Sequence, residues 1–352
     1  MRLEPREHTS GAALLLAPLA AVVFTLLVSA VLVAWAGAPV GRTYALVLQG
    51  GFGSVFAWSE TLTRAVPLIL TGLAATVAFK ARLYNIGAEG QLYAGALAAV
   101  AVGGVQVGTD LAAPAWLMFP AMLLAAALAG ALLLLVPALL KARLGVDEVV
   151  TTLLLNFIAL LGVSALLDGV MKDPSALGWP QSLALASELE LSKLIPGTRV
   201  HSGLLLAAAL AIALAVLFKH TLLGFQIRAT GANARAAAFV GVPALRTTVI
   251  VACLSGALAG LAGVVEVAGR TGYVTLDMSP GYGYSGIVIA LLAALNPLGV
   301  LGAAVFIAGV LVGADSMSRA VGVPTYLADV IVATSLLSVL VATLFAQYRV
   351  RW

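Results

Sequence analysis

The chain has 352 residues, of which 62% are hydrophobic and only 10% are charged. Soluble domains have about 45–50% apolar and about 25% charged residues, because their surfaces need charge. The composition therefore excludes a soluble globular protein and predicts an all-α, polytopic membrane protein. The net charge is only +4, and the basic residues form no cluster of five or more. No nucleic-acid partner is therefore expected.

Cysteine and histidine usage argues against a metal site. Cys253 is the single cysteine, so the chain forms no internal disulfide and no cysteine-based metal site. The histidines His8, His201 and His220 are far apart, whereas a metal site needs clustered ligands. The chain also lacks a G-K-[ST] phosphate loop, an HExxH motif and a G-x-S-x-G motif. We therefore predict no cofactor and no enzymatic activity, and we expect any ATP hydrolysis on another chain.

Ten apolar segments are candidates for membrane spans of about 20 residues. The first is too long for the roughly 7–15 apolar residues of a signal peptide, so we expect a retained span. The eighth and ninth, which Asn296-Pro297 separates, could instead be a broken hairpin or one kinked helix. We predict one membrane domain, residues 1–352. The ten segments are 11–36, 62–79, 86–105, 115–140, 149–168, 203–218, 246–268, 284–295, 297–313 and 326–346.

The distribution of lysine and arginine predicts the orientation. With the N-terminus inside, 12 of these residues fall on internal segments and 7 on external ones. Cytoplasmic loops carry the excess of basic residues, so both termini are expected in the cytoplasm. Segment 169–202 is then an external loop, and the basic segment 219–245 is internal.

The first polar segment, residues 83–91, lies between two predicted spans. Asn85, Glu89 and Gln91 alternate there with glycines that permit irregular backbone. A carboxylate at a membrane edge needs a partner or water. The segment is therefore a candidate gate beside a solute path. Alternatively, Glu89 complements the N-terminus of the next helix.

The second polar segment opens the fifth predicted span. Asp147 is placed to cap that helix, and Glu148 adds a favourable charge at its N-terminus. Thr151, Thr152 and Asn156 continue near one face, where they must find polar partners. Asn156 could line a path or could hold two helices together.

The third segment, within residues 219–245, predicts a short internal helix. Asn233 can cap a helix from Ala234 to about Phe239, which Gly241 and Pro243 end. Arg228 and Arg235 flank it. Such a short helix is marginal in water, so we expect it to dock on a partner.

The fourth segment, residues 269–286, is rich in glycine and tyrosine and resembles non-helical backbone that lines a cavity. Tyr282 and Tyr284 could stack on a base or sugar, or could anchor the chain at the interface. Glu266, late in the seventh span, needs a partner. Predicted spans 2–3 and 7–8 share the order helix, glycine- and tyrosine-rich break, helix, in opposite directions, which is typical of inverted repeats.

Three strings together resemble a known family. They are Tyr84–Gln91, Asp147–Asn156 and Arg228–Ala237 with Gly241, and they occur in order within residues 60–340. They resemble permeases of ABC importers in the branched-chain amino acid/ribose superfamily, in the branch for nucleosides and simple sugars.

The resemblance implies a multi-pass protein of the bacterial inner membrane that moves nucleosides or related sugars. It implies three protein partners: a tandem ATP-binding subunit, a second and often non-identical permease, and an extracytoplasmic substrate-binding lipoprotein. Membrane lipid surrounds the pair. Residues Arg228, Asn233, Arg235 and Gly241 would then belong to the helix that couples to the ATPase.

Two other functions are weighed against this one. The first is a permease of the same superfamily for ribose-like sugars or branched-chain amino acids. The second is an ion-coupled secondary transporter, which typically buries ionisable residues at mid-span. Because nearly all charges here fall at predicted span ends, the sequence favours the importer.

Overall fold

The computed structural model describes residues 2–5 and 23–322, except residues 25, 36 and 107–109. Beyond residue 322 it describes residues 330, 333–334, 337–338, 341 and 348–351. Two compact units are present, the first formed by residues 1–62 and 305–352 and the second by residues 63–304. Each unit is considered separately below.

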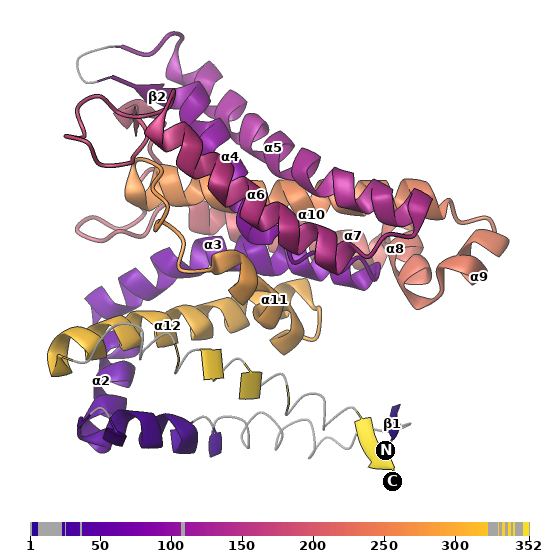
Figure 1. Ribbon diagram of the computed structural model, residues 1–352, viewed down its shortest axis with the longest axis horizontal. Coiled ribbons are helices and arrows are strands. Elements are labelled where there is room, and N and C mark those ends of the chain that lie inside the picture. Colours follow the sequence, from indigo (N-terminus) through magenta and orange to yellow (C-terminus); the bar gives the residue numbers. More distant parts are fainter. Residues whose placement is uncertain are drawn as a thin grey trace. The chain divides into compact units, whose positions relative to one another are not determined.

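Helices dominate the described residues (Figure 1). A five-residue π-helix, η2 (Val267–Thr271), continues α10, and a short pair of strands, β2 (Gly104–Val105) and β3 (Ala184–Leu185), connects two loops. The helices are α2 (Val40–Phe52), α3 (Val55–Lys80), α4 (Ala88–Gly103), α5 (Ala115–Leu144), α6 (Glu148–Asp168), η1 (Ser187–Leu189), α7 (Gly203–His220), α8 (Leu222–Ala232), α9 (Ala234–Phe239), α10 (Ala244–Glu266), α11 (Tyr282–Leu292) and α12 (Pro297–Val321).

Within the described ranges, six helices are long and apolar enough to cross a membrane. A seventh span is possible if residues 26–35 and α2, which meet at a bend of 116°, count as one. The polytopic helical fold is therefore confirmed, but the count of ten spans is not. The predicted segment 326–346 lies mostly outside the described residues, as does the first part of 11–36.

Two predicted spans, 86–105 and 284–295, form helices that are too short to cross. The helices α4 and α11 have 16 and 11 residues, or about 24 Å and about 16 Å of length. The hydrocarbon core is about 30 Å thick. Their N-termini meet, because a methyl group on Gly283 would overlap the backbone of Ala88 and Glu89. The two short helices therefore form a broken element inside the second unit.

The spacing of small residues explains the packing of α4, α5 and α10. A methyl group on Gly256 would overlap the carbonyl oxygen of Gly130, and one on Gly260 would overlap that of Ala126. A methyl group on Gly95 of α4 would likewise overlap Gly260. Glycines four residues apart allow such close backbone approach between membrane helices. The three helices are thus in backbone contact at their crossings.

The first unit uses the same kind of packing. A methyl group on Gly309 of α12 would overlap the ring of Phe52, and one on Gly313 would overlap the carbonyl of Val47 in α2. Residues 2–5 (β1) pair antiparallel with residues 348–351 (β4), so the two ends of the chain lie together. The helix α2 was not predicted, since its sequence contains three glycines and several polar residues.

Helix ends follow local signals where those signals are strong. Asp147 caps α6, as predicted, because its Oδ1 accepts a hydrogen bond of 2.8 Å from the N–H of Val149. Gly145 ends α5 in the left-handed conformation, with φ of 69°, which glycine adopts without strain. Capping residues thus determine the turn between α5 and α6.

Candidate translocation path and coupling segment

A buried polar network joins the start of α4 to α3 and α10. Asn85 donates a hydrogen bond of 3.0 Å from Nδ2 to Oε1 of Gln91, and Gln91 returns one of 2.9 Å from Nε2. The Nδ2 of Asn85 also donates to Oγ of Ser255 in α10 at 3.2 Å. Ser255 in turn donates to the carbonyl of Ala74 in α3 at 2.8 Å. The break before α4 is therefore anchored to two long helices by side chains that are almost completely buried.

Asn156 connects α6 to this break. Its Oδ1 accepts a hydrogen bond of 2.8 Å from the N–H of Gly90, and its Nδ2 donates to the carbonyl of Ile86 at 2.7 Å. The same Nδ2 lies 3.2 Å from the hydroxyl of Tyr284 in α11. One amide side chain thus ties α6 to the first turns of both short helices.

Glu89 lies where the two short helices meet. Its Oε2 accepts a hydrogen bond of 2.6 Å from the N–H of Gly283, in the first turn of α11. Its carboxylate also bonds to the side chain of Ser279, whose Oγ accepts from the N–H of Tyr282 at 3.0 Å. Backbone N–H groups at a helix start lack intrahelical partners. Glu89 and Ser279 therefore satisfy the start of α11.

Glu266 is paired rather than isolated. Arg270, one turn later in η2, forms an ion pair with it and also donates to the hydroxyl of Tyr282 at 3.2 Å. Thr71 of α3 donates a hydrogen bond of 2.9 Å to the carbonyl of Tyr282. Tyr282 is therefore held at both ends, and its side chain is fully buried.

The seven residues predicted to form a path or gate come together around α4 and α11. Six of them (Asn85, Glu89, Gln91, Asn156, Glu266 and Tyr282) are at most 3% exposed, and every one has a hydrogen-bond partner. Tyr284 is 38% exposed. In this conformation the six shape the break between the short helices rather than line an open cavity, and Tyr284 is the member that reaches the surface of the chain.

A second polar contact closes the turn between α5 and α6. Lys141 Nζ lies 2.5 Å from Oε1 of Glu148 and 2.6 Å from the carbonyl oxygen of Arg82. Glu148 also accepts a hydrogen bond of 3.1 Å from the N–H of Tyr84. The sequence predicted only that Glu148 adds a favourable charge at the start of α6. Its contacts with Lys141 and Tyr84 were not predicted, because nothing in the neighbouring sequence indicates them.

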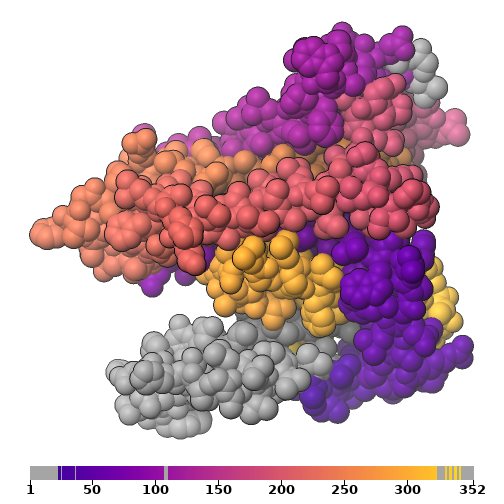
Figure 2. Space-filling model, turned by 180° about the vertical axis from the view of Figure 1, so that it is seen from behind, coloured from indigo at the N-terminus to yellow at the C-terminus, as the bar shows by residue number. Residues whose placement is uncertain are grey.

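The short helix predicted within residues 219–245 is present with the predicted bounds. Asn233 Oδ1 accepts hydrogen bonds of 3.0 and 3.1 Å from the N–H groups of Arg235 and Ala236, which caps α9. Gly241 has φ of 89° and ends the turn that follows. Arg228, in α8, and Arg235 are exposed. Figure 2 shows this part of the chain projecting at one end of the second unit.

The surface of α9 is largely uncovered in the single chain. Phe239 is 92% exposed and Val240 is 73% exposed. The helix α8, which directly precedes α9, packs closely against the end of α3. A methyl group on Gly231 of α8 would overlap the carbonyl oxygen of Lys80 there. The segment thus combines an exposed apolar tip with a rigid base.

The described residues include no group of three or more His, Cys, Asp or Glu side chains that could hold a metal ion. His201 is buried beside Gly203 and Gly269, in the segment between α6 and α7. Burial lowers the pKa of His201 to about 4, and its Nδ1 has no hydrogen-bond partner. This histidine is therefore a neutral packing residue.

These features define a class of protein. Several apolar helices, two short helices that meet inside the bundle, and polar side chains gathered at the break are typical of membrane transport proteins. The chain belongs to the family described as branched-chain amino acid transport system / permease component, which matches residues 57–342. No solved structure matches the chain.

Relatives within the family include permeases of named transporters. A glucose ABC transporter permease protein of Haloferax volcanii is 39% identical over 87% of this chain and 82% of its own length. A guanosine ABC transporter permease protein of Bacillus subtilis is 34% identical over 92% of both chains. A second guanosine permease protein of Bacillus subtilis is 30% identical over 70% of this chain and 77% of its own length.

Proposed function

We propose that this chain is the membrane permease subunit of an ATP-driven ABC importer for nucleosides or related simple sugars. The observation that carries the proposal is the match to ABC permease proteins for guanosine and for glucose over most of the chain. The chain itself carries no phosphate loop, so ATP hydrolysis occurs on a separate tandem ATP-binding subunit.

The proposed path runs beside the break between α4 and α11. Asn85, Gln91 and Asn156 fix the start of α4, while Glu89 and Tyr282 fix the start of α11. Irregular backbone inside a membrane protein persists only where protein or a water-filled cavity covers it. These residues, with Glu266, therefore act as a gate that holds the break closed, and Tyr284 faces the solute.

The proposed coupling site is the surface of α9. Its exposed tip, with Phe239 and the basic side chain of Arg235, suits a groove of mixed apolar and acidic character on the ATPase. The contact of Gly231 with Lys80 transmits movement of that tip to the end of α3. Arg82 and Tyr84 lie in the short segment between Lys80 and Asn85, where the polar network begins.

The remaining partners follow from the same proposal. Two guanosine permease proteins of one organism both resemble this chain, which supports pairing with a second, non-identical permease. The helices α5 and α6 expose large apolar side chains, among them Leu128 and Phe157, and these contact lipid or the second permease. An extracytoplasmic lipoprotein delivers the substrate at the bacterial inner membrane, and both termini lie in the cytoplasm.

Uptake in cells that lack or express the complete transporter tests the proposal. We expect uptake of labelled guanosine or glucose to stop when ATP is depleted and to persist when ionophores collapse the ion gradients. The opposite pattern would indicate an ion-coupled transporter and would refute the proposal. A neighbouring pair of genes for an ATPase and a lipoprotein would support it independently.

The coupling site has its own test. Arg235→Glu should weaken co-purification of the ATPase with the permease while membrane insertion stays normal. Arg143→Glu, which changes an exposed arginine at the end of α5, is the matched control. If both variants retain the ATPase equally, α9 is not the coupling site.

A further inference from the structure

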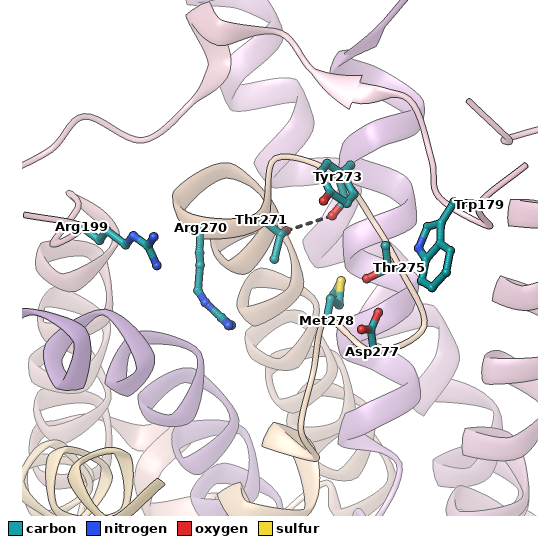
Figure 3. Close-up of a pocket in the computed structure, with 8 residues that line it drawn as sticks. All are labelled: Trp179, Arg199, Arg270, Thr271, Tyr273, Thr275, Asp277 and Met278. Atoms are coloured by element: carbon teal, nitrogen blue, oxygen red, sulfur yellow. Dashed lines mark hydrogen bonds between the residues drawn. The ribbon is translucent and has the colours of Figure 1, made fainter. Parts of the chain in front are cut away.

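A pocket of about 460 Å³ (Figure 3) lies in the second unit, at the end away from α9, which Figure 1 labels. The helix α10 separates the two features, since α9 precedes its first residue and the pocket follows its last turn. The pocket is lined by Trp179, Arg199, Arg270, Thr271, Tyr273, Thr275, Asp277 and Met278. By the predicted orientation, this is the external side.

The walls of the pocket are fixed by hydrogen bonds between two distant segments. Ser182 donates from its N–H to the carbonyl of Val274 at 3.0 Å, and its Oγ accepts from the N–H of Val274 at 2.8 Å. The N–H of Leu185 donates to the carbonyl of Gly272 at 2.7 Å. The external loop and the break before α11 therefore form one preformed wall.

The pocket carries the groups that recognise a ring with hydroxyls. Trp179 and Tyr273 are 62% and 38% exposed, so their faces are available for stacking. Asp277 is exposed and can accept hydrogen bonds from two neighbouring hydroxyls. Figure 3 shows Trp179, Thr275 and Asp277 on one side, with Arg199 and Arg270 on the other. A volume of this size suits a small-molecule ligand.

The charges favour a neutral ligand over a phosphate. Arg270 is already paired with Glu266, which compensates its charge. Arg199 and Asp277, on opposite sides of the pocket, carry opposite charges that offset each other. A phosphate would meet this carboxylate, whereas an uncharged nucleoside would meet an acceptor for its ribose hydroxyls. The chemistry therefore fits the nucleoside class.

The pocket also touches the gate. Arg270, in its wall, donates to the hydroxyl of Tyr282. Met278 is followed by Ser279, which bonds to Glu89. Tyr93 of α4 donates a hydrogen bond of 2.6 Å to the carbonyl of Leu276, within the same wall. A ligand in the pocket would thus contact Arg270, which bonds to Tyr282 at the start of α11, and Met278, which precedes Ser279.

We propose that this pocket is an external subsite of the permease, where Trp179 and Tyr273 stack on a nucleoside and Asp277 binds its ribose hydroxyls. The inference rests on the proposed function and adds a substrate site that belongs to the permease itself. The subsite accepts the nucleoside before the gate at Glu89 and Tyr282 opens.

Direct binding to the complete permease–ATPase assembly in detergent, without the lipoprotein, tests the subsite. The probe is tritiated guanosine, and unlabelled glucose and guanosine 5′-monophosphate are the competitors. We expect Asp277→Asn and Trp179→Ala each to weaken guanosine binding by roughly tenfold, because each removes a hydrogen-bonding or stacking partner. The matched controls, Asp168→Asn at the exposed end of α6 and Trp116→Ala in α5, should bind as the unaltered protein does.

Each outcome decides the proposal. If glucose competes and guanosine 5′-monophosphate does not, the site belongs to free sugars and the nucleoside assignment is overturned. If guanosine 5′-monophosphate binds more tightly than guanosine, the preference for a neutral ligand is overturned. Normal guanosine binding by both variants, combined with weaker capture of the lipoprotein, would show a protein-docking surface instead. If the assembly binds no guanosine although ATP drives uptake, the subsite fails while the proposed function stands. All variants are compared by gel filtration and thermal unfolding, which detects misfolding.

Discussion

Replacement of Glu89 tests whether hydrogen bonding at the meeting point of α4 and α11 stabilises the permease. Glu89 accepts a hydrogen bond of 2.6 Å from Gly283 and bonds to Ser279, and it is 3% exposed. In Glu89→Leu, both donors lose their acceptor in a site that water does not reach. A buried donor without an acceptor costs about 1–3 kcal/mol, so we expect a loss of about 3 kcal/mol.

The isosteric variant separates hydrogen bonding from packing. Glu89→Gln keeps a side-chain oxygen that accepts from the N–H of Gly283, so we expect it to cost only about 1 kcal/mol. Thermal unfolding in detergent measures the difference. With roughly 2–4 °C per kcal/mol for a chain of this size, the leucine variant should melt about 6–12 °C lower and the glutamine variant about 2–4 °C lower.

The control is Glu188, an exposed residue in η1, between α6 and α7. Glu188→Leu should change the melting temperature by no more than about 2 °C, as is usual for surface substitutions. Equal destabilisation by Glu89→Gln and Glu89→Leu would show that an acceptor oxygen at this position is not what stabilises the site. An unchanged leucine variant would refute the argument entirely.

Three further predictions concern other parts of the second unit. Gly231→Ala should cost about 1–3 kcal/mol and lower ATP-driven uptake, since the new methyl group overlaps the carbonyl of Lys80. Gly162→Ala, on an exposed face of α6 where the new methyl group meets open space, should leave uptake unchanged. Asn233→Ala should cost about 1 kcal/mol through the lost cap and reduce retention of the ATPase, as judged by co-purification. His201, with a folded pKa of about 4 against an ordinary value of 6.5, binds its proton mainly after unfolding, so stability is complete above pH 6.5 and falls toward pH 4. The melting curves should therefore indicate a loss of about 2 kcal/mol between pH 7.5 and pH 5, and His201→Gln should remove that part of the dependence.

Local signals predicted some elements well. The cap and bounds of α9 depend on Asn233 and the glycine at 241, and the start of α6 depends on Asp147; both agree with the structure. Such features involve residues only two to eight positions apart. The composition of the chain was likewise sufficient to predict a helical membrane protein.

Contacts between distant segments could not be predicted in the same way. Glu89 lies in the first turn of α4, as the sequence predicted, but its bond to Gly283, which is 194 positions away, could not be predicted. Ser279 and Ser255 were not predicted as site residues, because a serine in an apolar segment gives no indication of its partner. The predicted segments 86–105 and 284–295 also continued past the ends of α4 and α11, because the apolar residues 104–105 and 293–295 form a strand and a turn.

The glycine contacts among α4, α5 and α10 also limit how the permease changes shape. Gly256 and Gly260 bring backbone against backbone, so one helix cannot slide past another without first separating from it. The helices α4, α5 and α10 therefore move together as one rigid body. Any movement of this body must change the backbone conformation of segments that are not helical. Two segments of that kind precede the short helices, residues 81–87 before α4 and residues 272–281 before α11. We therefore expect these segments to serve as hinges, and a disulfide engineered across either one would stop transport without unfolding the helices.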